Sequence, residues 1–376
     1  MNTIAITENR DEMIAIAKEI AEEKKKYYNA PMFQFLTDYV RDMMPDASAQ
    51  EIEDTVYLTI YHYWVYGCTY EEYFYYHFAE KSHEEKQSYM TFRLRLQYID
   101  HISKKEDAHL LSNKYETYQL FTKEYDRDVI ICNSDADYPI FKAFAGKHSE
   151  FVVKPTVMSG GKGVYKTGVA GLNEAQLEAF YRNLLSESRS SQEKYLHGDQ
   201  ESVVIEELID QADELAVFHP ASVNSIRVPT LLINGEVKIY QPWFKIGRDG
   251  HFLTSSLFGS LIAGVDAETG IVDTVGMTQS GEEWAYHPDT HQQILGFRIP
   301  QWEELKEMSA ECARRLPMFG YIGWDFALSK KGWCIMEGNH SGNFMWQLFR
   351  KRGMKKDFED LIGWKLDKEF WWQESK

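Results

Sequence analysis

The sequence predicts an α/β protein of the α+β kind, in which a mainly helical N-terminal region precedes two parts that combine helices with β-sheet. Three observations predict this class. Apolar residues recur at helical spacing as far as about residue 110. From Lys114 onward, short runs rich in Val and Ile alternate with helical segments. Beyond Ser225 the apolar runs lengthen and are joined by turns such as Asn234-Gly235, which is typical of hairpins.

The chain has 376 residues, which is enough for two or three domains with a sizeable core. We expect a helical region over 1–110, a first α+β part over 111–205 and a second over 206–376. The change of pattern near Lys114 and the start of the long β-runs set these boundaries.

The N-terminal region is predicted to contain at least three helices. Residues 10–26 are dominated by Glu, Lys and Ala, with apolar residues at helical spacing. Asp46-Ala47-Ser48 predicts the start of a second helix that runs to Tyr66, and Thr69-Tyr70-Glu71-Glu72 predicts the start of a third. Aromatic residues of these helices indicate a packed core, and an aromatic ligand box is the alternative: Tyr61, Tyr63, Trp64, Tyr73 and Phe74.

The remainder is predicted to alternate between helices and strands. Helices are expected at 114–125, 137–146 and 302–315. Strands are expected at 128–132, 151–154, 203–207, 225–233 and 237–246, and a final hairpin at 321–337. The polar segment 186–200 is expected to be a mobile loop.

Composition narrows the function classes. A formal net charge of -17 argues against a general nucleic-acid binder, although a local basic pocket remains compatible with it. The four cysteines have no CxxC spacing, which indicates neither a zinc site nor a disulfide framework. The N-terminus lacks an apolar signal region, and no stretch is long and apolar enough for stable membrane insertion. We therefore expect a cytoplasmic protein.

A glycine-rich loop follows the strand 151–154 in "VVKPTVMSGGKGV". Lys154 ends the strand, and Ser159, Gly160, Gly161, Lys162 and Gly163 follow five residues later. Glycines let backbone N–H groups approach an anion, and lysines supply charge, so the pattern suits phosphate binding. It is neither a Walker A loop nor a dinucleotide fingerprint. An ordinary hairpin turn is the alternative.

The final hairpin carries paired acids in "GWDFALSKKGWCIMEGNHSGN". A three-residue loop, Lys330-Lys331-Gly332, would place Asp325 opposite Glu337. Two carboxylates facing each other about 5 Å apart at Cβ should repel, and a divalent cation such as Mg²⁺ would remove that penalty. Asn339 has the same parity and offers a further oxygen. The other face would carry apolar residues suited to a core: Phe326, Leu328, Cys334 and Met336.

In this order the elements resemble the ATP-grasp superfamily. More narrowly, "HPASVNSIRV", "HPDTHQQILGFRIPQW" and the hairpin motif resemble the sugar-transfer associated ATP-grasp family, over roughly residues 65–350. The resemblance implies two α+β subdomains that grip ATP, with Mg²⁺ as the metal.

The resemblance also implies roles for individual residues. Lys114 in "LSNKYETY" and Lys154 match the phosphate-binding lysines, and Ser159 to Gly163 match the loop that closes over the phosphates. Glu206, Glu207, Leu208 and Ile209 match the adenine hinge, and Asp213 or Glu214 the ribose contact. Asp325, Glu337 and Asn339 match the Mg²⁺ ligands.

Arg227, assisted by Asn224, matches an arginine that steadies the transferred phosphoryl group. Lys245 and Arg248 keep the positive charge of an "RxGR" stretch, whereas the Asp-Asn that follows in the family is missing. That departure bears on the specificity for the acid or the acceptor.

The implied activity is an ADP-producing ligase that joins a carboxylate to an amine through an acyl-phosphate. The substrates would be a small-molecule or saccharide-linked carboxylate and an amine, in polysaccharide or cell-surface biosynthesis. The alternatives are a kinase of the same fold, a nucleotidyl transferase and a non-catalytic nucleotide-binding protein of a polysaccharide assembly system. Intact charged residues at the lysine and acid positions argue against the last of these.

Overall fold

The computed structural model describes residues 4–158, 160–193, 202–254 and 259–372, with the backbone alone for 188–193. By contact the chain forms two compact units. Unit 1 comprises Met1–Ile102, Ser280–Glu282 and Asn343–Lys376, and unit 2 comprises Ser103–Gln279 and Glu283–Gly342. This division differs from the expected boundaries at 110 and 205. Unit 1 joins the N-terminal helices with the C-terminal segment, and unit 2 continues across residue 205.

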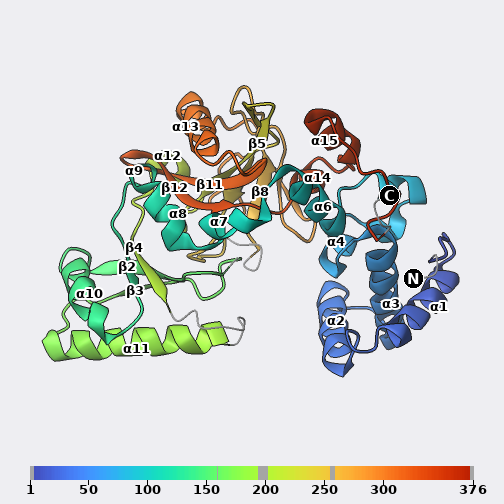
Figure 1. Ribbon diagram of the computed structural model, residues 1–376, viewed down its shortest axis with the longest axis horizontal. Coiled ribbons are helices and arrows are strands. Elements are labelled where there is room, and N and C mark those ends of the chain that lie inside the picture. Colours follow the sequence, from blue (N-terminus) through green and yellow to red (C-terminus); the bar gives the residue numbers. More distant parts are fainter. Residues whose placement is uncertain (1–3, 159, 194–201, 255–258, 373–376) are drawn as a thin grey trace. The chain divides into compact units, whose positions relative to one another are not determined.

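Unit 1 is helical (Figure 1). Its helices are α1 (Arg10–Glu23), α2 (Ala30–Met43), α3 (Ala49–Tyr66), α4 (Tyr70–Tyr75), η1 (Phe78–Glu80), α5 (His83–Gln87), α6 (Phe92–Ile102), α14 (Trp346–Phe349) and α15 (Lys355–Ile362). The predicted helix starts are confirmed. Ser48 and Glu51 form a capping box at the start of α3, and Thr69 and Glu72 form another at the start of α4.

The aromatic residues of unit 1 pack against one another. Tyr61 is fully buried, and Tyr73 is 4% exposed. The His62 ring lies between them, with ring centroids 5.5 Å from Tyr61 and 5.0 Å from Tyr73. These contacts support the predicted packed core over an aromatic ligand box.

His62 is expected to make the stability of unit 1 depend on pH. Its Nδ1 donates to the Leu58 carbonyl at 2.7 Å, and burial, helped by the Lys86 ammonium, lowers the pKa of His62 to about 3. Below about pH 6.5, the ordinary histidine pKa, His62 binds a proton in the unfolded chain but stays neutral in the folded chain. The free energy of unfolding should therefore fall between about pH 6.5 and pH 3, by roughly 1.4 kcal/mol for each pH unit.

Urea denaturation of the protein and of His62→Phe over this pH range measures the effect. Glu72 acts in the opposite direction, because burial raises its pKa from 4.5 to about 7, but it is present in both proteins and cancels in the difference. As the pH falls, the free energy of unfolding of the unaltered protein should decrease relative to that of His62→Phe. A difference that does not change with pH would contradict the prediction.

Unit 2 contains a small sheet in the order β1-β4-β2-β3, all antiparallel. Its strands are β1 (Val129–Cys132), β2 (Glu150–Pro155), β3 (Tyr165–Gly168) and β4 (Val203–Glu207). Its helices α10 (Tyr138–Ala145) and α11 (Glu174–Glu193) cover one face through a core that includes Phe141, Phe151 and Tyr181. The expected loop at 186–200 is wrong as far as Glu193, where the chain is still helical; residues 194–200 lie outside the described residues.

Short helices precede the small sheet. They are η2 (Lys105–Asp107), α7 (His109–Ser112), α8 (Lys114–Leu120) and α9 (Thr122–Tyr125), and η3 (Asp135–Asp137) lies between β1 and α10. The single helix predicted for 114–125 is broken at Phe121, whose φ is -129°. Phe121 is fully buried, with its ring centroid 5.3 Å from that of Trp324. Packing into the core therefore outweighs continuation of the helix.

The second sheet of unit 2 has eight strands in the order β10-β9-β8-β7-β5-β11-β12, with β6 paired to β5. The strands are β5 (Ser225–Ile233), β6 (Glu236–Ile239), β7 (Trp243–Ile246), β8 (Leu261–Gly264), β9 (Gly276–Met277), β10 (Glu283–Trp284), β11 (Tyr321–Ser329) and β12 (Gly332–Asn339). The helix α13 (Trp302–Arg314) packs on one face through Trp302 and Leu305, and α12 (Asp213–Ala216) joins the same core through Leu215. The strand predicted for 237–246 is two strands, because Gln241 has a φ of 49° and Pro242 has no N–H.

The β11–β12 hairpin reaches the predicted Asp325–Glu337 pair by a different path. The turn is one residue shorter than expected, since Ser329 pairs with Gly332. A β-bulge at Met336 then restores the pairing of Asp325 with Glu337. The bulge also turns Glu337 to the opposite face from Ile335, which lies in the core with Phe326.

The predicted apolar face of β12 is consequently wrong for Cys334 and Met336. Before the bulge, Trp333 and Ile335 point into the core, while Cys334 pairs with Ala327 on the other face. A one-residue shift reverses every side chain of a strand, so the shorter turn explains the error.

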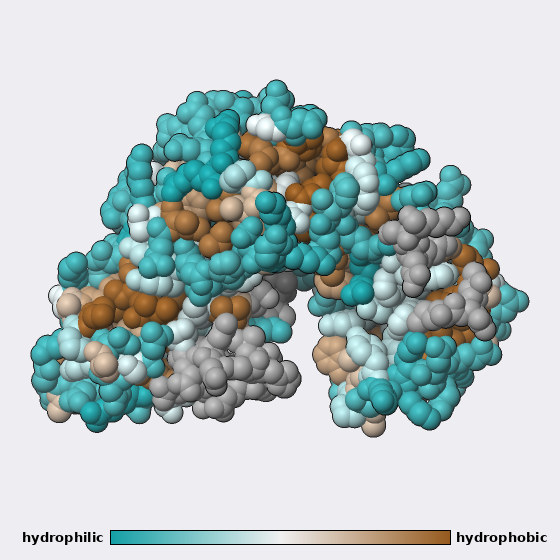
Figure 2. Space-filling view, viewed as in Figure 1, coloured by the Kyte–Doolittle hydropathy of each residue, from teal (hydrophilic) through white to brown (hydrophobic). Residues whose placement is uncertain are grey.

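Among the described residues, none of the helices combines the length and apolarity that a membrane crossing requires. The face drawn in Figure 2 is mostly hydrophilic, and its apolar areas are separate patches. This surface agrees with the high proportion of charged residues in the sequence, 26%.

Candidate functional site

A row of charged side chains crosses three neighbouring strands of the large sheet, on the face opposite the core. Asp325 of β11 pairs with Glu337 of β12 on one side and with Arg227 of β5 on the other. Lys245 of β7 lies beside this row, because its cross-strand partner is Ser225, two residues before Arg227. The sheet therefore brings two carboxylates and two cations together from four strands.

Arg227 and Asp325 form a bidentate ion pair. The distances are 2.8 Å from Nε to Oδ1 and 2.7 Å from Nη2 to Oδ2, and Lys245 Nζ lies 3.4 Å from Oδ1. Asp325 is only 1% exposed. Burial acts to raise the pKa of Asp325, but the Arg227 and Lys245 charges outweigh it and hold the pKa well below its usual value. The expected repulsion from Glu337 is thus offset by Arg227, which the sequence did not place on this carboxylate.

The acids and the amide fit a magnesium site by their chemistry. Asn339 Nδ2 donates to Glu337 Oε1 at 3.3 Å and to the Gly323 carbonyl at 3.4 Å, which leaves the amide oxygen as an acceptor. Oδ1 of Asp325 accepts from both Arg227 and Lys245, whereas among the described contacts Oδ2 accepts only from Arg227 Nη2, so Oδ2 keeps a lone pair. Three hard oxygen donors on one face are what Mg²⁺ prefers.

Lys154 and Glu206 occupy the face of the small sheet opposite its core. Lys154 Nζ donates to Glu206 Oε2 at 2.8 Å. The same oxygen accepts from Arg127, at 3.0 Å from Nε and 2.8 Å from Nη2. Burial acts to raise the pKa of Glu206, and the two cations outweigh it, so that the pKa falls to about 2.

Sequence reasoning missed Arg127. The residue stands between Asp126 and Asp128 just before a strand, where a solvated turn is the usual interpretation. In the structure it is 9% exposed, and only the pairing of β1 with β4 reveals its partner.

The predicted adenine hinge, Glu206 to Ile209, divides into two parts. Glu206 lies between β1 and β2 in the sheet, opposite Val129 and Val152. Glu207 Oε2 accepts from the Asp128 backbone N–H at 3.0 Å. The carboxylates of Glu206 and Glu207 therefore accept hydrogen bonds from other groups of this protein. Leu208 and Ile209 follow the strand end and are partly exposed, so they are the part of the segment that is suited to contact a base.

Lys114 lies close to the glycine loop and within electrostatic range of Glu337 and Glu206. Its backbone N–H donates to the Thr156 carbonyl at 3.0 Å, and its Nζ to the Met158 carbonyl at 2.5 Å. Burial lowers the pKa of Lys114, Glu337 and Glu206 act to raise it, and Lys154 lowers it further. The two predicted phosphate lysines are thus close enough to influence each other.

The glycine loop uses backbone conformations that glycine favours. Gly160, Gly161 and Gly163 have φ values of 71°, 76° and 70°. Lys162 is exposed. Ser159 lies outside the described residues. The predicted phosphate contact of this loop remains a proposal.

Asn224 does not present its side chain to the charged row. It is fully buried, its Nδ2 donates to the Leu215 and His219 carbonyls, and its Oδ1 accepts from the Gly247 N–H at 3.0 Å. Its side chain therefore holds the backbone at Leu215, His219 and Gly247, and its catalytic role stays a prediction.

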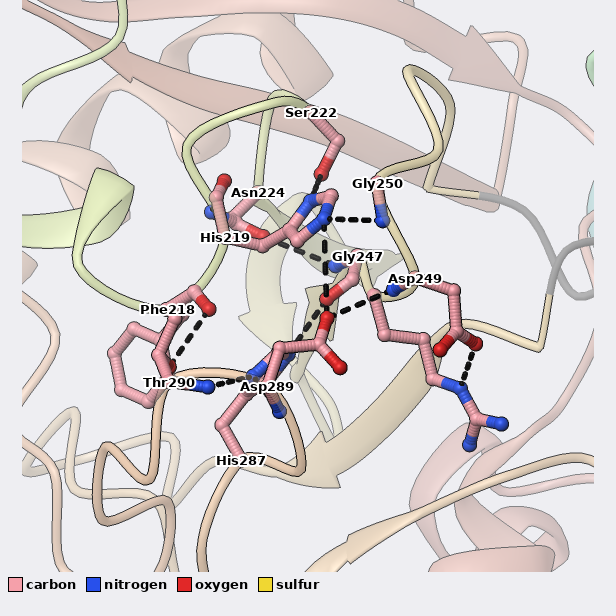
Figure 3. A network of polar contacts seen from close by, with 11 residues as sticks. Phe218, His219, Ser222, Asn224, Gly247, Asp249, Gly250, His287, Asp289 and Thr290 are labelled. Atoms are coloured by element: carbon pink, nitrogen blue, oxygen red, sulfur yellow. Dashed lines mark hydrogen bonds and ion pairs between the residues drawn. The ribbon is translucent and has the colours of Figure 1, made fainter.

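Two histidines of the quoted motifs hold the chain after β7 (Figure 3). His287 Nε2 lies 2.7 Å from the Gly247 carbonyl, which only accepts, so this nitrogen donates. His219 Nε2 accepts from the Gly250 N–H at 3.1 Å. A Cβ at Gly247 would lie 2.0 Å from Ser222 Oγ, so this approach requires glycine. The network fixes the segment that begins with Lys245.

Arg248 Nε donates to Asp249 Oδ2 at 2.7 Å. Asp213 is exposed at the start of α12, near Lys330. Their predicted roles toward acceptor and ribose remain proposals.

A small antiparallel sheet that follows its second strand with a glycine loop, and a larger sheet that presents acids and lysines on one face, are the two halves of an ATP-grasp protein. The chain belongs to the sugar-transfer associated ATP-grasp family, whose sequence profile matches residues 93–361. ATP-grasp proteins use ATP together with Mg²⁺, and most of them are ligases. No curated protein matches the sequence.

The comparison with solved structures found matches of low identity and low TM-score. D-alanyl-alanine synthetase A from Vibrio cholerae shares 14% identity over 67% of this chain and 60% of its own, with a TM-score of 0.39. D-alanine-D-alanine ligase from Helicobacter pylori shares 16% over 69% and 63%, with a TM-score of 0.41. A biotin carboxylase domain from Hydrogenobacter thermophilus, solved with MgADP, shares 13% over 62% and 41%, with a TM-score of 0.38. The chain spans less than two thirds of the length of each.

Proposed function

We propose that this protein is an ATP-dependent carboxylate–amine ligase that forms an amide through an acyl-phosphate. The observation that carries the proposal is the row Glu337–Asp325–Arg227 with Lys245 beside it. Acids that can hold a metal thus stand next to cations that can neutralise a phosphoryl group in transfer. Charge stabilisation of this kind is the main task of a protein that catalyses phosphoryl transfer.

Each group has a separate task in the proposal. Lys114, Lys154 and the amides of residues 160–163 bind the phosphates of ATP, and Leu208 and Ile209 contact the base. Asp325, Glu337 and Asn339 hold Mg²⁺, which supplies Lewis-acid charge when bound. The substrate carboxylate oxygen then forms a bond to the γ-phosphorus, while the bond from that phosphorus to the β-bridging oxygen breaks and ADP leaves. The amine attacks the acyl carbon, phosphate leaves, and the amine loses a proton.

Arg227 is suited to steady the transferred group without leaving Asp325. The ion pair uses Nε and Nη2. The third nitrogen, Nη1, lies close to two glycines. A Cβ on Gly323 would lie 2.9 Å from Nη1, and a Cβ on Gly342 would lie 2.7 Å from it. These two glycines keep the space next to Nη1 open. Lys245, whose side chain is 22% exposed, is the second candidate cation.

Hydroxylamine trapping tests the proposal. An acyl-phosphate is a strong electrophile, so pooled carboxylic acids with Mg²⁺-ATP and hydroxylamine, without an amine, should give a hydroxamate with equal ADP and phosphate. Lys245→Met should lower hydroxamate formation on the order of a hundredfold, the effect of losing one stabilising group, while ATP affinity is kept. Lys330→Met, an exposed lysine on the β11–β12 turn, is the matched control.

Other products would identify the alternatives. AMP and pyrophosphate would indicate nucleotidyl transfer. A stable phosphorylated alcohol with no hydroxamate would indicate the kinase. ATP binding without turnover in any pool would support the non-catalytic protein. An anionic saccharide among the acids that react would support the role in polysaccharide or cell-surface biosynthesis.

A further inference from the structure

Arg127 makes an unusual set of contacts between the two sheets of unit 2. Nε and Nη2 both donate to Glu206 of β4. Nη1 donates to the Ile335 carbonyl of β12 at 2.7 Å and to the Tyr125 carbonyl at 3.1 Å. The guanidinium also lies 4.5 Å from the centre of the Tyr125 ring. One side chain thus joins the strand that carries Glu206 to the strand that carries Glu337.

The same contacts set the charge beside Lys154. Arg127 and Lys154 share one oxygen of Glu206, so the three groups together carry one positive charge. Without Arg127, Glu206 and Lys154 would form a neutral pair. The side chains of Arg127 and Glu206 are each 3% exposed and that of Lys154 is 14% exposed, so little solvent screens the difference.

We propose that Arg127 is a positioning residue for the nucleotide: it pairs with Glu206, so that the cluster around Lys154 Nζ keeps a net positive charge for the phosphates. This inference rests on the proposed nucleotide site. It goes beyond that site because Arg127 acts on the nucleotide through Glu206 and Lys154.

Calorimetric titration with Mg²⁺-ATP tests the proposal through charge compensation. Arg127→Met should raise the Kd by on the order of tenfold to a hundredfold, because the remaining Glu206–Lys154 pair is neutral. Adding Glu206→Gln to Arg127→Met leaves Lys154 as the only charged group of the three. This double variant should therefore recover a Kd within about threefold of the unaltered protein.

Two further variants keep the test decisive. Arg127→Lys preserves the net charge and should also bind within about threefold, which carries the test if Arg127→Met does not fold. Arg182→Met, an exposed arginine paired with Glu178 on α11, is the control and should bind as the unaltered protein does.

An unchanged Kd in Arg127→Met, or a double variant as weak as that single variant, would overturn the inference. Weakening by Arg127→Lys as severe as by Arg127→Met would do the same. Failure of the unaltered protein to bind ATP would instead overturn the nucleotide site itself, so the two failures are distinguishable.

Discussion

Asp325→Asn is expected to lower ATP turnover on the order of a thousandfold and to destabilise the protein by about 3 kcal/mol. The first effect follows from the loss of a proposed metal ligand. The second follows from the buried Arg227 guanidinium, which would lose its bidentate carboxylate. The acid pair alone would suggest the opposite, a stability that is unchanged or raised. Turnover and urea denaturation, measured on the same preparations, separate these expectations.

Glu337→Gln is the matched comparison. It removes the other proposed metal ligand but leaves the Arg227–Asp325 ion pair intact, so turnover should fall while stability is unchanged or raised. A double-mutant cycle between Arg227→Met and Asp325→Asn should show a large coupling free energy, because the two side chains form one buried ion pair. Full turnover in Asp325→Asn would contradict the proposed metal site. A free energy of unfolding equal to that of the unaltered protein would contradict the ion-pair argument.

Replacing Lys114 and Lys154 together by methionine is expected to weaken Mg²⁺-ATP binding by about a thousandfold. Each lysine is proposed to make a charge-assisted contact with a phosphate. The fold should survive, because Glu206 keeps Arg127 as its partner and because Lys114 is already desolvated at a cost that lowers its pKa. Calorimetry measures the affinity, and thermal unfolding checks the fold.

Lys147→Met is the control for the lysine pair. Lys147 is an exposed cation paired with Asp128 at one end of the small sheet. Its loss should leave the affinity for Mg²⁺-ATP unchanged. An unaltered affinity in the Lys114 and Lys154 double variant would show that the nucleotide does not bind there.

Local patterns in the sequence determined most of the secondary structure. Capping residues such as Ser48 predicted helix starts, and β5 begins and ends as predicted, at Ser225 and Ile233. A count back from the expected turn Lys330-Lys331-Gly332 predicted the pairing of Asp325 with Glu337, and the structure has this pairing, although it reaches it through a shorter turn and a bulge. The helix starts and the strand limits depend on neighbours within a few residues, so the sequence carries them directly.

Only the tertiary structure decided what surrounds the two carboxylates. Arg227 lies on Asp325 because β5 pairs with β11, and Arg127 reaches Glu206 because β1 pairs with β4. The use of Asn224 as a backbone anchor for Gly247 likewise depends on a contact that is not local in the chain. Pairings across some eighty or more residues leave no local pattern in the chain. The sequence therefore determined which charged residues are present and on which strands, and the non-local pairing decided which of them neutralise one another.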